Sequence, residues 1–450
     1  MSRYSLIPAP RNSLLCNRKA GNQMNKRLQA LALSAAMVIS MTACGSKGGS
    51  VSKANKNVTI TIFNSKTEIA DQMKELASEY EKASGVRVKV DSPDETVSLH
   101  LATRYVANDP YTISMVDAKD IYTLAADHAA DLSKEKWVDD TKQAISVKGK
   151  VYGFPFCMEG RGIIYNASAI KKVTGRDFDP SSVQTLDEFR SLLEELEEKG
   201  MKSPVGIQAE DWSLGAHYFP QIYEDQEDTD SFIEKLHKGT ADIASDKKFN
   251  SIMDTFDVLM MYNYASADPL KADRETTERM LAEGDIAFMF GGTWDWSLIE
   301  KYNPSDEMGL MPIPQNTDDG TNTKLVAGST KYLFIDNSDS ISDKERQAAK
   351  DFLNWLVYDK AGQQLITKTC GLVSPFTNNS VDAADPLGKS LEQYLKDDKL
   401  ISWYNFLPDD QQATVGAMTQ QYLGKKTDRA QFAGQIESYW KNARLSTSRR

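Results

Sequence analysis

The alternation of apolar and polar positions at the start of the mature chain predicts a strand, a helix and a second strand. Residues 58–63 are rich in β-branched side chains, and residues 69–83 carry apolar side chains at helical spacing. Gly85 marks the end of that helix, and residues 86–90 alternate between valine and basic residues as a half-buried strand does. A β-α-β unit of this kind is typical of a parallel sheet covered by helices.

The same alternation continues along the chain, so the predicted fold class is α/β. Further strands are predicted at 111–116, 149–156, 162–165, 286–290 and 325–336. Helices are predicted at 121–131, 185–199, 249–262, 275–283 and 343–358, and through most of the C-terminal region. The helix at 185–199 has acidic residues in its first turn and ends before Gly200, as helix-end preferences require.

The N-terminal segment has the composition of a secretory signal. Residues 28–43 contain no charged side chain, follow a basic pair and end in small residues before Cys44. A cysteine at this place, followed by a Gly/Ser-rich tether, resembles the lipobox of bacterial lipoproteins, which implies a lipid anchor on Cys44. We therefore expect a signal peptide at 1–43, then lipidated Cys44 and a flexible linker at 44–56.

Two alternatives stay open for this segment. It is an ordinary signal peptide with a chance cysteine, or a short membrane anchor, although the apolar run is shorter than the about 20 residues that span a bilayer. Residues 1–23 contain two prolines and additional basic residues, so we expect the natural start at Met24.

Length and charge limit the classes of partner. The mature part has about 400 residues, more than one hydrophobic core usually serves, and therefore predicts two domains. The formal net charge is −11, and it becomes −17 without residues 1–43, which hold six basic and no acidic residues. An acidic chain disfavours nucleic acids and anionic lipids as partners. Cys157 and Cys370 lie far apart in sequence; buried free thiols are the favoured interpretation, and a disulfide is the alternative.

Sequence motifs for catalysis and for cofactors are missing. The chain has no HExxH, GxSxG or phosphate-loop motif, and its four histidines show no metal-ligand spacing. We therefore expect a protein that is not an enzyme and holds no metal or cofactor. Pairs of carboxylates are numerous, so a glycoside hydrolase stays open as an alternative.

Tryptophans beside polar residues in irregular segments are the most specific chemical signal. Trp212 follows an acidic pair, Trp294 follows a Gly-Gly turn and a buried strand, and Trp403 precedes a tyrosine and an asparagine. Sugars present flat C–H faces and hydroxyl groups, which suit aromatic rings and Asp, Asn, Glu or Arg side chains. Core packing is the alternative for each tryptophan, but the glycines before Trp294 permit close approach of a ligand.

These features, in this order, resemble the extracellular solute-binding proteins of sugar ABC transporters. The segments that carry the resemblance cover essentially the whole mature chain: the lipobox, 60–90, 149–155, 165–166, 185–189, 282–294, 309–314, 349–356 and 421–425. The resemblance implies a two-lobed periplasmic-binding-protein-like fold of type II, with a hinge and a ligand cleft between the lobes.

The resemblance also implies how the chain is divided. Lobe one is expected to comprise 57–161 and 326–372, and lobe two 162–325 and 373–443. Hinge crossings are expected near 159–163, 312–326 and 371–376, which are rich in glycine or proline.

Carried over by position, the expected ligand-binding residues come from both lobes and from the hinge. They are Asn64, Ser65 and Glu68 after the first strand, Asp117 and Asp120 at a strand end, Glu159 and Arg161 at the first crossing, Trp212, Trp294 and Trp403 as stacking residues, and Ser329 and Lys331 on the return strand. Carboxyl ends of strands are where open α/β sheets bind ligands. Each polar residue also has a structural alternative, such as a charge in the first turn of a helix or a turn residue.

The function implied by the resemblance is capture of a sugar, with an oligosaccharide favoured by the aromatic residues, and delivery to an ABC transporter permease. The protein is expected to be a monomer on the extracytoplasmic face of the cell membrane, anchored through Cys44, without a nucleic-acid partner. The alternatives are a binding protein for a cationic solute or peptide, a surface glycosidase or esterase, and a ligand sensor for a membrane kinase.

Overall fold

The computed structural model describes residues 58–443 except 94, 96 and 409. All described residues belong to one compact unit. The expected signal peptide, Cys44 and the linker at 44–56 lie outside the described residues. In the described part, no helix is both long enough and apolar enough to cross a membrane.

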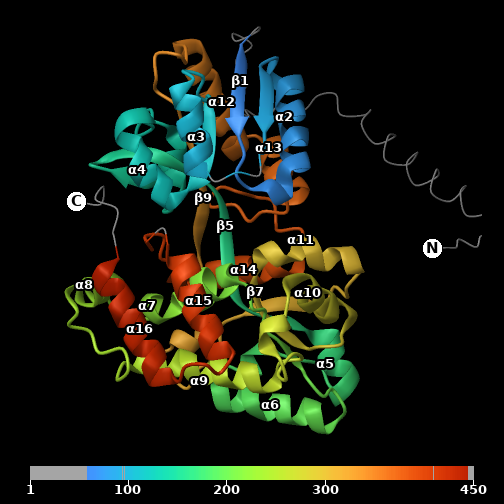
Figure 1. Cartoon of the computed structure of the whole chain (residues 1–450). Helices are drawn as coiled ribbons and strands as arrows, with labels where there is room; N and C mark the ends of the chain where they lie inside the picture. Colours follow the sequence, from blue (N-terminus) through green and yellow to red (C-terminus); the bar gives the residue numbers. More distant parts are fainter. Residues whose placement is uncertain (1–57, 94, 96, 409, 444–450) are drawn as a thin grey trace, which may run out of the picture. The chain divides into compact units, whose positions relative to one another are not determined.

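One mixed sheet runs through the described residues and connects two lobes (Figure 1). Its main strands lie in the order β2 (Arg87–Asp91), β1 (Thr59–Phe63), β3 (Ile113–Asp117), β9 (Leu325–Ile335), β5 (Lys150–Asn166), β7 (Phe288–Gly292) and β6 (Val205–Gly206). Three short strands pair beside this path: β10 (Leu400–Ser402) with β9, and β4 (Ile145–Val147) and β8 (Met308–Met311) with β5.

The β-α-β unit predicted at the start of the chain is confirmed. Strands β1 and β2 pair in parallel, and helix α2 (Ala70–Ser84) connects them. Met73, Leu76 and Tyr80 recur at helical spacing on α2 and are buried. Helix α2 ends at Gly85, whose φ of 78° is a left-handed conformation that glycine adopts without steric cost.

The first lobe has helices on both faces of its part of the sheet. Buried side chains of α2 and α12 (Asp343–Tyr358) form one hydrophobic cluster with the strands, and those of α3 (Val97–Val106) and α4 (Ala118–His128) form another. Helix α13 (Lys360–Gln364) follows α12. The helix predicted at 343–358 has the bounds expected for it, whereas the helix predicted at 121–131 begins and ends three residues earlier.

The second lobe is also covered on both faces, which confirms the α/β class. One cluster is formed by α5 (Ala167–Thr174), α6 (Leu186–Glu198), α7 (Gln221–Glu224), α8 (Thr229–Lys238), α9 (Lys247–Tyr262), α15 (Gln411–Leu423) and α16 (Arg429–Asn442). The other cluster is formed by α10 (Arg274–Glu283), α11 (Trp296–Ile299) and α14 (Pro386–Lys396).

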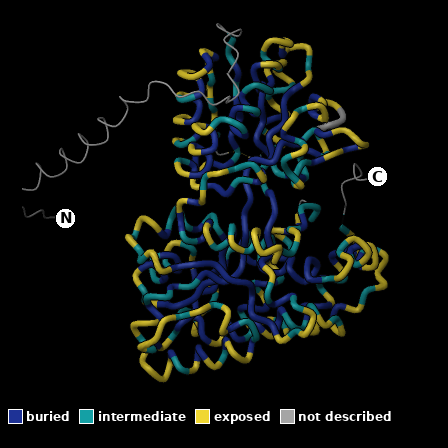
Figure 2. Tube along the Cα trace, turned by 180° about the vertical axis from the view of Figure 1, so that it is seen from behind, coloured by how far each residue is buried: buried dark blue, intermediate teal, exposed yellow. Residues whose placement is uncertain are grey.

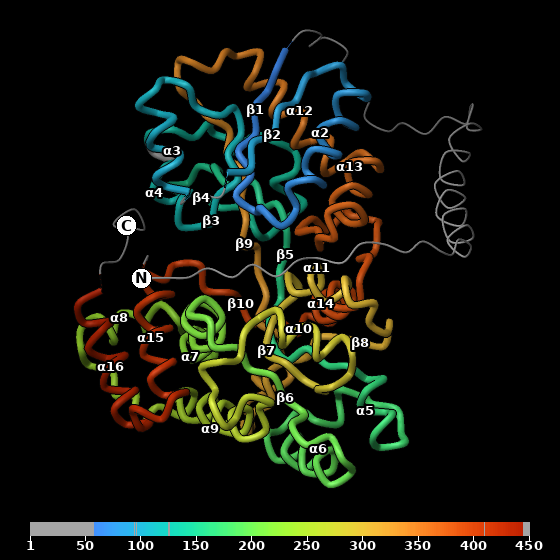
Figure 3. Tube along the Cα trace, turned by 45° about the vertical axis from the view of Figure 1, so that its right-hand side comes forward, coloured from blue at the N-terminus to red at the C-terminus, as the bar shows by residue number. Residues whose placement is uncertain are grey.

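Strand β5 extends without a break from the first lobe into the second. Its 17 residues pair with β4 and β9 at the start and with β7 and β8 at the end. Figures 2 and 3 show β5 and β9 side by side between the lobes, and both are largely buried. The prediction of two separate strands at 149–156 and 162–165 was therefore wrong. Glu159 and Arg161 interrupt the apolar pattern, but both side chains are paired inside the protein.

The return from the second lobe to the first runs along β9 and not through residues 312–326 as predicted. Residues before β9 are still bound to the second lobe, since Thr255 Oγ1 donates to the carbonyl of Pro314 at 2.6 Å. A third segment lies beside β5, where the amide of Met158 donates to the carbonyl of Val373 at 2.8 Å, within the predicted crossing at 371–376.

Cys157 and Cys370 are both buried free thiols, which confirms the favoured interpretation over the disulfide. Cys157 lies on β5 and Cys370 just before the third segment, and both belong to the hydrophobic cluster under α2.

A substitution at Gly162 tests how closely β5 packs against β8. A Cβ atom at Gly162 would lie 2.2 Å from the carbonyl oxygen of Met311 on β8. We expect Gly162→Ala to lower the free energy of unfolding by about 1–3 kcal/mol, the usual range for overpacking, because the two strands must separate. Urea denaturation of the soluble body measures this difference.

Gly434→Ala is the matched control, because a Cβ at this position on α16 meets no atom within 4 Å. Alanine is favoured over glycine in a helix by about 1 kcal/mol, so this variant is expected to be as stable as the parent or more stable. Equal destabilisation of the two variants would contradict the packing of β5 on β8.

Candidate ligand-binding site

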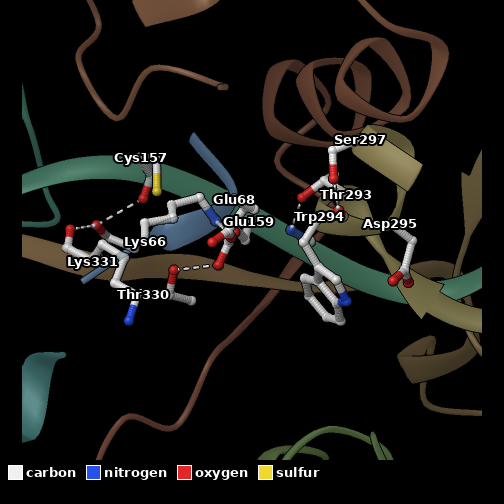
Figure 4. Close-up of polar contacts among 12 residues, drawn as sticks. Lys66, Glu68, Cys157, Glu159, Thr293, Trp294, Asp295, Ser297, Thr330 and Lys331 are labelled. Atoms are coloured by element: carbon white, nitrogen blue, oxygen red, sulfur yellow. Dashed lines mark hydrogen bonds and ion pairs between the residues drawn. The ribbon is translucent and has the colours of Figure 1, made fainter. Parts of the chain in front are cut away.

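A buried ion pair at the middle of β5 joins this strand to the loop after β1 (Figure 4). Lys66 Nζ lies 2.7 Å from Glu159 and 2.8 Å from Glu68, and the Thr330 hydroxyl donates to the other oxygen of Glu159. Burial alone would raise the pKa of Glu159 and lower that of Lys66, but the opposite charge of the partner outweighs burial in each case. The pKa of Glu159 is therefore lowered and that of Lys66 raised, and both groups are charged at neutral pH.

A second ion pair lies at the carboxyl end of β3. Asp117 and Lys331 face each other in the antiparallel pairing of β3 with β9, and Lys331 Nζ lies 2.6 Å from Asp117 Oδ1. The amide of Asp117 donates to the carboxylate of Asp120 at 3.2 Å. Burial, with a contribution from the Asp117 charge, raises the pKa of Asp120 to about 6. At this edge of the sheet, Asp117 is thus paired with the ammonium group of Lys331, and Asp120 has a pKa close to neutral pH.

Three tryptophans of the second lobe surround His217. The centroid of the His217 ring lies 4.7 Å from that of Trp294 and 5.6 Å from those of Trp212 and Trp403. His217 Nδ1 lies 2.7 Å from the carbonyl oxygen of Trp212; because a carbonyl only accepts, Nδ1 carries the hydrogen and Nε2 is an acceptor. Burial, together with the charge of Arg161, lowers the pKa of His217 to about 4, so the ring is neutral at pH 7. All three tryptophans are half-buried, so part of each ring is accessible.

Arg161 lies against the ring of Trp403. Its guanidinium carbon is 4.2 Å from the ring centroid, and it forms an ion pair with Glu224 in which both side chains are fully buried. The other oxygen of Glu224 accepts a hydrogen bond from the amide of Tyr404 at 2.8 Å. Glu224 therefore fixes both Arg161 and the backbone next to Trp403. Arg161 in turn makes a cation–π contact with the Trp403 ring.

Arg274 lies against the ring of Trp212 as Arg161 lies against the ring of Trp403. Its guanidinium carbon lies 5.1 Å from the ring centroid, and its nitrogens lie 2.8 Å from Glu278 and 2.7 Å from Asp295. Burial raises the pKa of Glu278, and the charge of Asp295 raises it further. Both carboxylates therefore hold Arg274 in place, and the raised pKa of Glu278 favours its protonated form.

The turn after β7 is connected to the same arginine. The amide of Gly292 donates to Asp295 at 2.9 Å, and a Cβ at Gly292 would lie 2.2 Å from the ring of Trp294. Glycine is required there because the Trp294 ring packs directly on the backbone. Through Asp295, Arg274 thus links the positions of Trp212 and Trp294.

A cavity of about 860 Å³ lies beside Trp294, between the two lobes. The first lobe lines it with the loop after β1 and the start of α2, and the second lobe lines it with the turn after β7, α11 and the start of α14. Residues 368–373 and the middle of β5 line it between these walls. The cavity shares Lys66, Glu68, Glu159 and Trp294 with the interactions described above.

The structure brings the predicted residues together around the middle of β5, but not all of them in the same way. Accessible surface is present on Ser65, Glu68, Asp117, Asp120, Trp212, Trp294, Lys331 and Trp403. Asn64, Glu159, Arg161 and Ser329 are buried. Asn64 hydrogen-bonds Ser92 and the backbone of Lys66, and the Ser329 hydroxyl donates to the carbonyl of Cys157. Glu159 lines the cavity although it is buried, and the ligand contacts expected of these residues stay predictions.

Sequence reasoning missed four residues of this arrangement. Lys66 and His217 stand in segments that the sequence had already marked, one beside Asn64 and Ser65 and one just after Trp212. Arg274 and Glu224 lie at ordinary helix positions without a motif, and only their contacts reveal them. Among the described residues, no group of three or more His, Cys, Asp or Glu side chains has a geometry that holds a metal ion.

Known proteins share both the sequence pattern and the fold. The family model of bacterial extracellular solute-binding proteins matches residues 75–394. RafE in complex with raffinose superposes with a TM-score of 0.70 at 19% identity, covering 86% of this chain and 99% of that one. A sugar transporter protein of Bacillus licheniformis in complex with stachyose gives 0.63 at 21% identity, covering 85% and 99%. A manno-oligosaccharide-specific solute-binding protein of Bifidobacterium animalis subsp. lactis in complex with mannotriose gives 0.61 at 20% identity, covering 86% and 95%.

At these identities the structural matches show the fold, and they confirm the prediction of a two-lobed periplasmic-binding-protein-like architecture. The family model covers well over half of the chain. The chain therefore belongs to the bacterial extracellular solute-binding proteins, a family that binds solutes and does not convert them.

Proposed function

We propose that this protein captures an uncharged oligosaccharide between its two lobes and delivers it to an ABC transporter permease. The observation that carries the proposal is the cluster of Trp212, Trp294 and Trp403 around neutral His217. Half-buried indole rings offer the flat apolar surfaces that sugar C–H faces require. The structural neighbours bound to raffinose, stachyose and mannotriose support the same ligand class.

The distribution of charge in the aromatic cluster and at the two ion pairs supports an uncharged ligand over a cationic solute or a peptide. Glu159 and Asp117 are already neutralised by Lys66 and Lys331. The faces of two of the tryptophans already hold arginines, so a cationic ligand would meet a like charge where it needs a free ring. The same pairing leaves no free pair of carboxylates in the aromatic cluster for glycoside hydrolysis.

The anchor and the division of the chain belong to the same proposal. Cys44 carries the lipid that holds the protein at the extracytoplasmic face of the membrane, close to the permease. Lobe one comprises 57–161 and 326–372, and lobe two comprises 162–325 and 373–443; the protein acts as a monomer and hinges along β5, β9 and the segment at 371–376. Ligand must bind the closed form better than the open form for closure to signal occupancy.

A ligand screen on the soluble body, residues 51–450, tests the proposal directly. A ligand that binds the native state raises the melting temperature by mass action. We expect a rise with one series among raffinose and stachyose, manno-, xylo- and chito-oligosaccharides, with the sugar recovered intact, and none with polyamines or short peptides. A rise with polyamines or peptides alone would rule out the sugar ligand, and conversion of the sugar would rule out a binding protein.

Trp294→Ala tests the stacking role on the saccharide found in that screen. Losing the buried contact of one aromatic side chain is worth about 1.5–3 kcal/mol, which corresponds to a roughly 10- to 100-fold weaker dissociation constant by titration calorimetry. Met261→Ala on α9, an exposed position that does not line the cavity, is the control and is expected to leave affinity unchanged. Unchanged affinity in Trp294→Ala would remove the ring from the binding site.

Cys44→Ala tests the anchor. In the host cell the parent is expected in the membrane fraction and labelled by a fatty-acid analogue, because the thioether lipid is attached to Cys44. The variant is expected in the soluble extracytoplasmic fraction without label, while Cys157→Ala keeps the label. Retention of Cys44→Ala in membranes would show that the N-terminal apolar segment is itself the anchor.

A further inference from the structure

The cavity beside Trp294 has walls from both lobes and lies next to the aromatic cluster without being part of it. Trp294 lines the cavity and also contacts His217, whereas Trp212 and Trp403 do not line it. At about 860 Å³ it lies near the upper end of the roughly 300–1,000 Å³ range of pockets that hold drug-sized molecules. The cavity and the aromatic cluster thus adjoin at the side chain of Trp294.

Trp296 gives this cavity an aromatic surface of its own. It begins α11 directly after the turn that carries Trp294, is half-buried and lines the cavity together with Ser297. Asp295, between the two tryptophans, is fixed by Arg274 and by the amide of Gly292. The turn therefore holds Trp294 and Trp296 in a fixed relation, one beside the cluster and one in the cavity.

Polar groups available to a ligand line the cavity opposite and beside this ring. The side chains of Gln72 on α2, Glu300 after α11 and Asp306 before β8 make no hydrogen bond or ion pair to any other described residue. Amide and carboxylate groups of this kind donate to and accept from sugar hydroxyls. Gln72 comes from the first lobe and the two acids from the second, so one bound molecule would contact both lobes.

The charges in the cavity agree with the same chemistry. Lys66 is neutralised by Glu159 and Glu68, so it does not attract an anion. The free carboxylates of Glu300 and Asp306 would repel an anionic group and would accept hydrogen bonds from hydroxyls.

From these observations we infer that the cavity is an extension subsite, in which Trp296 stacks on the additional sugar units of a longer oligosaccharide and Gln72, Glu300 and Asp306 bind their hydroxyls. This inference rests on the proposed capture of a saccharide. It adds where the additional sugar units of a longer oligosaccharide bind, and that longer oligosaccharides bind more tightly than shorter ones. Affinity then increases with chain length, because only a longer ligand fills both the cluster and the cavity.

The test is a chain-length series with and without the Trp296 ring. The probes are raffinose and stachyose, which differ by one hexose, and manno-, xylo- and chito-oligosaccharides of two to six units, measured by titration calorimetry on the soluble body. In the parent, affinity is expected to rise with length; in Trp296→Ala, the longest ligand loses about tenfold while the shortest one that binds changes by less than about threefold. Trp296→Phe keeps an aromatic face and is expected to restore most of the gain.

Leu298→Ala is the matched control, because Leu298 lies on the same short helix and does not line the cavity. It shows whether a disturbance of α11, and not the loss of the ring, accounts for the effect, and melting temperatures of all variants verify that they fold. An equal loss in Leu298→Ala and Trp296→Ala would overturn the inference.

The remaining outcomes separate the inference from the proposed function. If saccharides bind the parent and Trp296→Ala binds every length equally well, the subsite is overturned and the proposed function stands. If Trp296→Ala weakens the shortest and longest ligands alike, the ring belongs to the primary site and the extension is overturned. If no saccharide binds the parent, both the proposed function and the subsite are overturned.

Discussion

The ion pair between Lys66 and Glu159 is the interaction on which the geometry of the site depends. Strand β5 passes through both lobes, and Glu159 lies at the point where it leaves the first. A carboxylate buried there without a partner would be strongly unfavourable, and removing one member of such a pair typically costs about 3–5 kcal/mol. Lys66 and Thr330 supply the compensation, so the loop after β1 and strand β9 are both held to the same carboxylate. This compensation allows the polar residues at the middle of β5 to be buried between the hydrophobic cores of the two lobes.

The aromatic cluster follows a related rule in which buried acids hold arginines and the arginines support indole rings. Glu224 holds Arg161 against Trp403, and Glu278 and Asp295 hold Arg274 against Trp212. The planar guanidinium suits this role because it forms directed hydrogen bonds at its edge and stacks through its face. Rings fixed before the ligand arrives lose little conformational entropy on binding. The acids therefore fix the positions of the rings through the two arginines.

The sequence predicted the regular elements better than the polar centre. Apolar periodicity located the β-α-β unit and the helix at 343–358, because these depend on local spacing. It failed at β5, where two strands were predicted at 149–156 and 162–165. The polar residues between them, Glu159 and Arg161, are paired with Lys66 and Glu224, which lie 93 and 63 residues away, beyond any local pattern. For the same reason the sequence could not show that the side chains of Asn64 and Ser329 are buried and hydrogen-bonded within the protein. A residue type and its place at a strand end indicate a polar site, but its contacts decide whether it faces inward or outward.

The two lobes offer unlike chemistry to the space between them, and this difference gives closure a physical basis. The second lobe supplies the indole rings, and the first supplies the ion-paired side chains of Lys66, Glu68, Asp117 and Lys331 near the carboxyl ends of β1 and β3. A sugar has apolar faces and a polar rim, so neither lobe alone satisfies both. A ligand that stacks on one lobe leaves its hydroxyls in water until the other lobe reaches them. The added contacts exist only in the closed form, and they are the differential affinity that a ligand needs to shift the population toward closure. Strand β5 belongs to both lobes and carries Glu159 between them, so under the proposed function a movement of the lobes would act on a strand that also lines the cavity.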